Sequence, residues 1–255
     1  MLNMRKLILL IVLSILLICP FRVVASELNA TDIVRRSDDL MRGDSRSGTY
    51  SMKIITRRWE RELALLVHSL GRDKMFIRIL SPAKEAGIGT LRIKNEMWNY
   101  LPSVEKTIKI PPSMMLRPWM GSDFANDDLV KESSIVNDYT HEIIGREVIN
   151  GESVLKIEFI PKPDAPVIWG KLYQWIREKD FVPLKEEYYS EKGKAIKVLE
   201  YSDIGQVSDR VIPRTWTMKS LTKKEHSTTI KLLDVTYNQP IDDAIFSMVH
   251  LRSVP

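Results

Sequence analysis

The sequence predicts a mainly β protein of the α+β class, built as one antiparallel meander of roughly eleven or twelve strands that curls on itself. From residue 50 onward, apolar and polar residues alternate over short segments, which is the period of half-buried strands. Turn residues such as Asn150 and Gly151 separate these segments and favour tight hairpins. No shift in composition and no repeat divides the chain, so a single domain with sequential strands is expected.

The N-terminus has the three parts of a secretory signal peptide. Two basic residues precede an apolar run over residues 7–18, and small residues follow at 23–25, a pattern typical of cleavage before residue 26. The run is too short to span a bilayer comfortably. We therefore predict a signal peptide over residues 1–25 and a periplasmic mature domain over 26–255. Cys19 is the only cysteine, and the bulky residue before it disfavours lipoprotein cleavage and lipidation.

Charge and cysteine content exclude some classes of protein. Cleavage would remove three of the 38 basic residues and none of the 33 acidic ones, leaving a mature chain that is close to neutral. A nucleic-acid partner requires a strongly basic face, so none is expected. The mature chain would contain no cysteine, so its stability must come from a hydrophobic core and not from disulfides.

The elements follow in order along the chain. An amphipathic helix is expected over residues 29–43, with Thr31 as a possible N-cap and Gly43 as its stop. A short helical piece is expected over 242–246. The strand-like segments cover residues 50–55, 63–67, 75–79, 87–93, 97–102, 104–110, 139–144, 154–160, 172–177, 182–189, 195–201, 211–219 and 228–236.

Residues 110–131 interrupt this series with a segment that suits neither a strand nor a long helix. The segment holds three prolines, three methionines and two aromatic residues. Methionine adapts to irregular apolar surfaces, which favours a lid or wall of a hydrophobic cavity. The alternative is a plug that completes the core, because most clusters of methionine and aromatic residues serve packing.

The sequence offers little support for catalysis or for a bound metal. The four histidines stand singly, without the spacing of metal ligands. The acidic group at residues 123–128 lacks the alternating oxygen ligands of a calcium loop. We interpret Ser122 and Asp123 as caps of a short helix, with Asp127 and Asp128 in its first turn. No enzyme activity, metal or cofactor is predicted.

Three motifs resemble the outer-membrane lipoprotein-sorting branch of the LolA-like superfamily. They are residues 98–102 (WNYLP), 119–124 (WMGSDF) and 127–129 (DDL), and the signal peptide, first helix and C-terminal turn extend the resemblance over the mature chain. The resemblance implies a strongly curved antiparallel half-barrel of about eleven strands, with short helices covering an apolar concave face. It also implies a soluble periplasmic protein, and members of this branch work beside exporters of the RND type.

The expected function is that of a periplasmic carrier or chaperone. It would bind a lipid or lipoprotein acyl chain and take part in lipoprotein sorting or lipid export, as a monomer beside an RND- or ABC-type inner-membrane transporter. An envelope-stress-sensing domain that binds lipid or an anti-sigma partner is the alternative. The residues expected to line the cavity or form its lid are Trp98, Tyr100, Met114, Met115, Leu116, Trp119, Met120 and Phe124.

Overall fold

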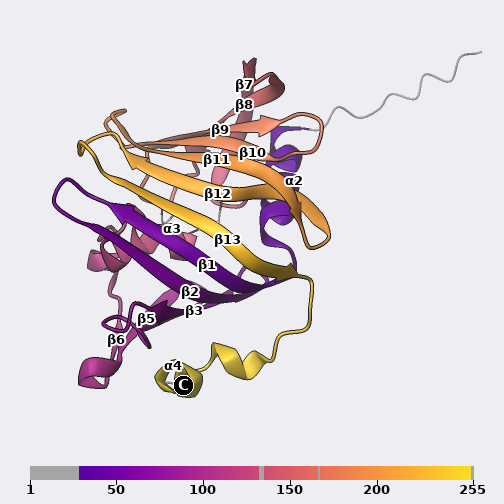
Figure 1. Cartoon of the computed structure of the whole chain (residues 1–255). Coiled ribbons are helices and arrows are strands. Elements are labelled where there is room, and N and C mark those ends of the chain that lie inside the picture. The colour runs from indigo at the N-terminus through magenta and orange to yellow at the C-terminus, as the bar shows by residue number, and fades with distance from the viewer. Residues whose placement is uncertain (1–28, 132–134, 166, 254–255) are drawn as a thin grey trace, which may run out of the picture.

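The computed structural model describes residues 29–131, 135–165 and 167–253 (Figure 1). The predicted signal peptide at 1–25 and Cys19 lie outside the described residues. Within these ranges, no helix has both the length and the apolar character needed to cross a membrane.

The described residues form one antiparallel sheet of thirteen strands. The strands are β1 (Ser45–Ile55), β2 (Glu60–Leu70), β3 (Lys74–Ser81), β4 (Gly89–Ile93), β5 (Glu96–Leu101), β6 (Lys106–Lys109), β7 (Tyr139–Ile149), β8 (Glu152–Pro161), β9 (Lys171–Arg177), β10 (Pro183–Tyr189), β11 (Ala195–Val207), β12 (Arg210–Ser220) and β13 (Ser227–Tyr237). The predicted number of about eleven is wrong. Each of the thirteen strand-like segments of the sequence, including the short β4, β5 and β6, forms a separate strand.

The sheet is curved and open (Figure 1). Its order is β6-β5-β4-β3-β2-β1-β13-β12-β11-β10-β9-β8-β7, so the first and last strands of the chain pair in its middle. The two edges are β6 and β7, which are consecutive in the sequence. The half-barrel expected from the family resemblance is therefore confirmed. The tight turn expected at Asn150 and Gly151 is also present, and both residues have positive φ, of 51° and 82°, as a type I′ hairpin requires.

Residues 110–138 connect β6 to β7 and therefore join opposite edges of the sheet. We call these residues the crossing segment. Its described part contains two 3₁₀ turns, η2 (Pro112–Met114) and η3 (Trp119–Gly121), followed by helix α3 (Asn126–Lys131). Trp119 and Phe124 pack in the core of the concave side, so the described part of this segment lies across the concave face. The topology explains why an apolar, proline-rich stretch separates two runs of strands.

Helix α2 (Ala30–Arg42) covers another part of the same face. The side chain of Asn29 caps it by accepting a hydrogen bond of 2.9 Å from the amide of Asp32. The expected cap at Thr31 is therefore wrong, and the Thr31 hydroxyl instead lies 3.0 Å from His141 Nδ1. Gly43, at φ 66°, ends the helix as expected. The helix buries Ile33 and Val34 against strands β8 and β9.

The C-terminal residues pack on the opposite face of the sheet. They form η5 (Asp243–Phe246) and α4 (Met248–Arg252), and Phe246 and Leu251 are buried against Phe76 and Leu91. Arg78 fixes this segment by donating hydrogen bonds to the carbonyls of His250 and Leu251, at 2.8 and 3.0 Å. A further 3₁₀ turn, η1 (Pro102–Val104), joins β5 to β6.

Candidate functional site

A cavity of about 210 Å³ lies between the concave face, helix α2 and the crossing segment. A single buried water requires only about 10–15 Å³ on this measure, so the cavity has room for a much larger guest. Its floor is formed largely by apolar side chains of the sheet. These are Tyr50, Met52, Leu65, Val67, Met75, Ile77, Leu172, Leu199, Trp216, Met218 and Ile230.

Helix α2 supplies one wall of the cavity. Val34, Asp38 and Met41 lie one turn apart on its inward face and all line the cavity. The carboxylate of Asp38 accepts a hydrogen bond of 2.9 Å from Arg42 and is also paired with Arg72. Its charge is therefore compensated within this wall.

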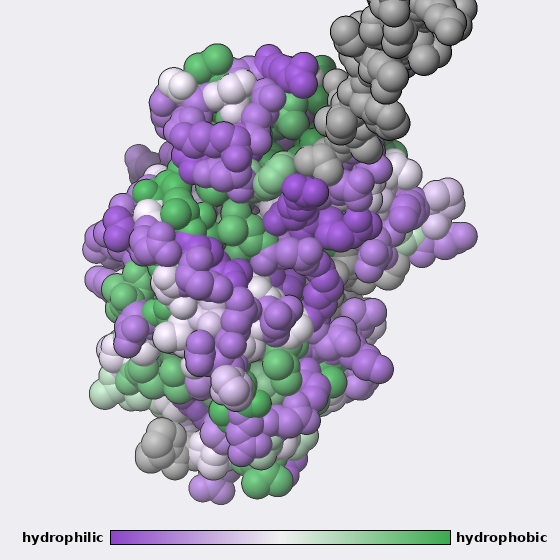
Figure 2. Space-filling view, turned by 90° about the vertical axis from the view of Figure 1, so that its right-hand side faces the viewer, coloured by the Kyte–Doolittle hydropathy of each residue, from purple (hydrophilic) through white to green (hydrophobic). Residues whose placement is uncertain are grey.

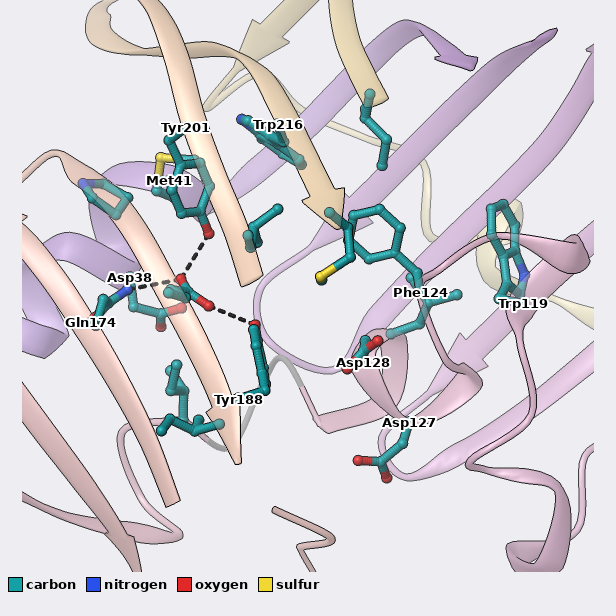
Figure 3. A pocket seen from close by; sticks show the side chains of 18 of the residues that line it. Asp38, Met41, Trp119, Phe124, Asp127, Asp128, Gln174, Tyr188, Tyr201 and Trp216 are labelled. Atoms are coloured by element: carbon teal, nitrogen blue, oxygen red, sulfur yellow. Dashed lines mark hydrogen bonds between the residues drawn. The ribbon is translucent and has the colours of Figure 1, made fainter. Parts of the chain in front are cut away.

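The crossing segment supplies the opposite wall through two aromatic side chains, Trp119 and Phe124 (Figure 3). The amide of Trp119 donates to the carbonyl of Phe124 at 2.7 Å, which closes a small loop. Within that loop Met120 and Gly121 have positive φ, of 48° and 76°. Trp119 Nε1 donates to Thr90 Oγ1 at 3.2 Å. The loop directs both rings toward the cavity. The hydrogen bond to Thr90 attaches the segment to β4.

A buried ion pair anchors the next part of the crossing segment. The carboxylate of Asp128 pairs with Lys197 on β11, and their side chains are only 11% and 7% exposed. Lys197 Nζ also lies 4.8 Å from the ring centres of both Trp169 and Tyr188. Asp128 accepts a second hydrogen bond, of 2.6 Å, from the amide of Ala125. One carboxylate thus caps α3 and attaches it to the sheet.

The expected caps of α3 are wrong. Ser122 Oγ donates to the carbonyl of Trp119 at 2.7 Å, because Ser122 belongs to the preceding loop. Asp123 is held by Thr228 of β13, whose hydroxyl lies 2.9 Å from both its amide and its carboxylate. Among the described residues, no group of three His, Cys, Asp or Glu side chains is placed to hold a metal ion.

A polar cluster interrupts the apolar lining at the side of the cavity formed by β9, β10 and β11. The carboxylate of Glu186 accepts hydrogen bonds from Gln174 Nε2 at 2.9 Å, from Tyr188 Oη at 2.6 Å and from Tyr201 Oη at 2.7 Å (Figure 3). Burial, reinforced by the charge of Glu186, raises the pKa of Tyr188 well above its ordinary value of 10. Tyr188 therefore stays protonated and donates.

One arginine also reaches the cavity. Arg46 is 6% exposed, and its guanidinium lies 6.0 and 5.8 Å from the ring centres of Tyr50 and Trp216. Stacking of a weakly hydrated guanidinium on aromatic rings makes its burial less costly. The cavity therefore contains buried groups of both signs.

The structure brings only part of the predicted set of residues to the cavity. Trp119 and Phe124 line it, and Met115 and Met120 pack half-buried against the same core cluster. Met114 and Leu116 are 42% and 62% exposed.

Trp98 and Tyr100 share one face of β5, but they pack in the cluster beneath the C-terminal helices. Met97, on the other face of the strand, joins the core of the concave side. Whether any of the eight predicted residues contacts a ligand stays a prediction.

The residues predicted for the site do not include the polar cluster, although β9 contains a signal for it. Leu172, Gln174 and Ile176 are the inward positions of this strand, and all three are buried. An amide at an inward position between two aliphatic residues indicates a buried polar contact. That signal becomes specific only when the pairing with Glu186 of β10 is known.

The outer surface differs from the cavity. On the face shown in Figure 2 it is mainly hydrophilic, with apolar side chains showing between the hydrophilic ones. Scattered apolar groups are normal on a protein surface. The largely apolar lining of the cavity is therefore the feature that points to binding.

Comparisons with known proteins agree with this architecture. A family model with the description "-like: Uncharacterized protein" matches residues 71–253. The chain belongs to this family. No curated protein matches it in sequence.

Three solved structures share its fold. A domain named for outer membrane lipoprotein sorting, from Vibrio parahaemolyticus, superposes with a TM-score of 0.77 at 23% identity, covering 88% of this chain and 98% of the domain. A DUF1329 family protein from Desulfovibrio piger gives 0.81 at 21% identity, covering 87% and 97%. A LolA superfamily protein from Nitrosomonas europaea gives 0.74 at 22% identity, covering 88% and 99%. The family member described here therefore has the LolA-like fold, as the sequence motifs predicted.

Proposed function

We propose that the protein is a periplasmic carrier whose cavity holds the hydrocarbon chain of a lipid or of an acylated lipoprotein. The observation that carries this proposal is the largely apolar cavity of about 210 Å³ lined by the sheet, α2 and the crossing segment. Each buried CH₂ group contributes about 0.8 kcal/mol. An acyl chain therefore gains affinity from its length alone, without a charged anchor.

The crossing segment is the part of the wall best suited to admit such a chain. Its described part contains two 3₁₀ turns and the six-residue α3 and takes no part in the sheet. Elements with few regular backbone hydrogen bonds open at the lowest cost. Two residues of this segment, Met115 and Met120, pack half-buried against the core, and their flexible side chains can repack around a guest.

The fold supports the same role. One of the structures that share it is named for lipoprotein sorting. In the proposed role, residues 1–25 direct export, the mature domain over 26–255 collects its cargo at the inner membrane from an RND- or ABC-type transporter, and Trp119 and Phe124 contact the bound chain.

A titration with an uncharged apolar fluorophore tests the proposal. Protein stripped of bound lipid on a hydrophobic resin is titrated with diphenylhexatriene, whose fluorescence rises in apolar surroundings. We expect saturable uptake of one probe per chain, reversed by a sixteen-carbon competitor. Fluorescence no higher than that of the same protein unfolded in urea would contradict the carrier function.

A further inference from the structure

Gln174 occupies an unusual position in the cavity wall. It is 6% exposed, lies between the aliphatic inward positions of β9, and lines the cavity. Its direct cross-strand partner is Glu186 on β10. Figure 3 shows it beside Tyr188 and Tyr201, around the point where their hydrogen bonds meet.

The orientation of the Gln174 amide follows from its partner. A carboxylate accepts hydrogen bonds, so the NH₂ group of the amide must face Glu186, and Nε2 lies 2.9 Å from its Oε1. The amide oxygen, Oε1, is then turned away from the carboxylate. Among the described residues, Gln174 Oε1 is a buried atom without a hydrogen-bond partner. An unpaired buried acceptor is costly, and a donor brought by a ligand removes that cost.

The hydroxyl groups of the two neighbouring tyrosines are already engaged with Glu186. Tyr188 and Tyr201 both donate their hydrogens to Glu186. One N–H of Gln174 and both hydroxyls are therefore directed at one carboxylate, which leaves the carbonyl oxygen of Gln174 as an acceptor for a guest. Acceptors and negative charge at this wall disfavour a ligand group that is itself an anion.

We infer that the cavity takes an apolar molecule whose polar end is a hydrogen-bond donor of the alcohol type, held by Gln174 Oε1, in preference to a chain ending in a carboxylate or phosphate. This inference rests on the proposed carrier function and specifies its cargo. The opposite preference would arise if Arg46, on another part of the lining, were the anchor, because a guanidinium selects anions.

Three ligands of equal chain length test the inference on the unaltered protein. Hexadecan-1-ol, its methyl ether and palmitate compete with bound diphenylhexatriene. The ether retains the oxygen and carries a methyl group in place of the donor hydrogen. We expect the alcohol to displace the probe at about one tenth of the ether concentration, the ratio produced by one neutral hydrogen bond, and palmitate to be weaker than the alcohol.

The outcomes separate the two proposals. Equal potency of alcohol and ether, or a stronger palmitate, would overturn the donor inference and leave the carrier function standing. Failure of all three ligands and of the probe would contradict the carrier function itself.

A matched pair of variants assigns the contact. Gln174→Met keeps the length of the side chain and removes the acceptor, so the alcohol-to-ether ratio should fall to about one while ether binding is retained. Gln206→Met, at an exposed position of β11, should keep the tenfold ratio. A tenfold ratio in Gln174→Met would overturn the assignment to Gln174. The wild-type comparison decides the ligand class even if Gln174→Met fails to fold.

Discussion

Trp119 links the crossing segment to the sheet. Its side chain is 2% exposed, belongs to the core cluster of the concave side and donates a hydrogen bond to Thr90. The same ring forms part of the cavity wall. Trp119 therefore belongs to the core and also lines the cavity, the two roles that the sequence suggests for this segment. Leu116, three positions earlier, is 62% exposed.

Replacing Trp119 should destabilise the whole protein. We expect Trp119→Ala to lower the free energy of unfolding by about 3–5 kcal/mol, the typical cost of truncating a buried aromatic residue. The control is Leu116→Ala, whose exposed side chain should change stability by less than about 0.5 kcal/mol. Urea denaturation followed by circular dichroism measures both. Similar midpoints for the two variants would show that Trp119 is not part of the core.

At the scale of elements, strand positions could be predicted from local patterns, but their arrangement could not. The period of two and the turn at Asn150 and Gly151 depend on neighbouring residues only. Pairing of β1 with β13 joins residues nearly two hundred positions apart, such as Thr49 and Asp234, and no local pattern specifies it. The edge-to-edge route of the crossing segment, and hence its place over the concave face, depends on that pairing.

The C-terminal segment, η5 and α4, covers part of the outer, convex face of the sheet. The contact between this segment and the sheet is sensitive to pH. The rings of His68 and His250 lie 6.3 and 4.8 Å from that of Phe76. Burial lowers the pKa of both histidines from the ordinary 6.5, with the positive charge of Arg78 adding to the effect at His250.

This contact predicts a loss of stability in mild acid. A histidine whose folded pKa lies below its unfolded value binds more protons when unfolded, so its contribution is complete above about pH 6.5 and is lost as the pH falls toward the folded pKa. The free energy of unfolding should therefore be lower at pH 5.5 than at pH 7.5, and by a smaller amount in the double variant His68→Gln and His250→Gln. Equal or greater wild-type stability at pH 5.5 would contradict this account of the outer cover.

For the whole molecule, the open sheet leaves a concave face that must be covered. The thirteen strands curve without closing into a barrel. Helix α2 and the crossing segment cover the concave face and leave the cavity between them. Trp119 and Phe124 could be predicted as part of the cover because clustered apolar residues mark it in the sequence. Gln174, Glu186 and Tyr201 could not, because they meet only when three adjacent strands are in register.

The most direct test of the carrier claim fills the cavity. Val67 of β2 is 7% exposed and lines the cavity, whereas Val148 of β7 is 73% exposed and lies outside it. Val67→Phe adds a ring where the guest should lie, and Val148→Phe adds the same ring at the surface. Native mass spectrometry of each protein, mixed with an excess of a sixteen-carbon lipid, counts the bound molecules. We expect one lipid per chain for the wild type and for Val148→Phe, and a loss of at least tenfold in occupancy for folded Val67→Phe. Equal occupancy in all three proteins would show that the cavity is not the binding site.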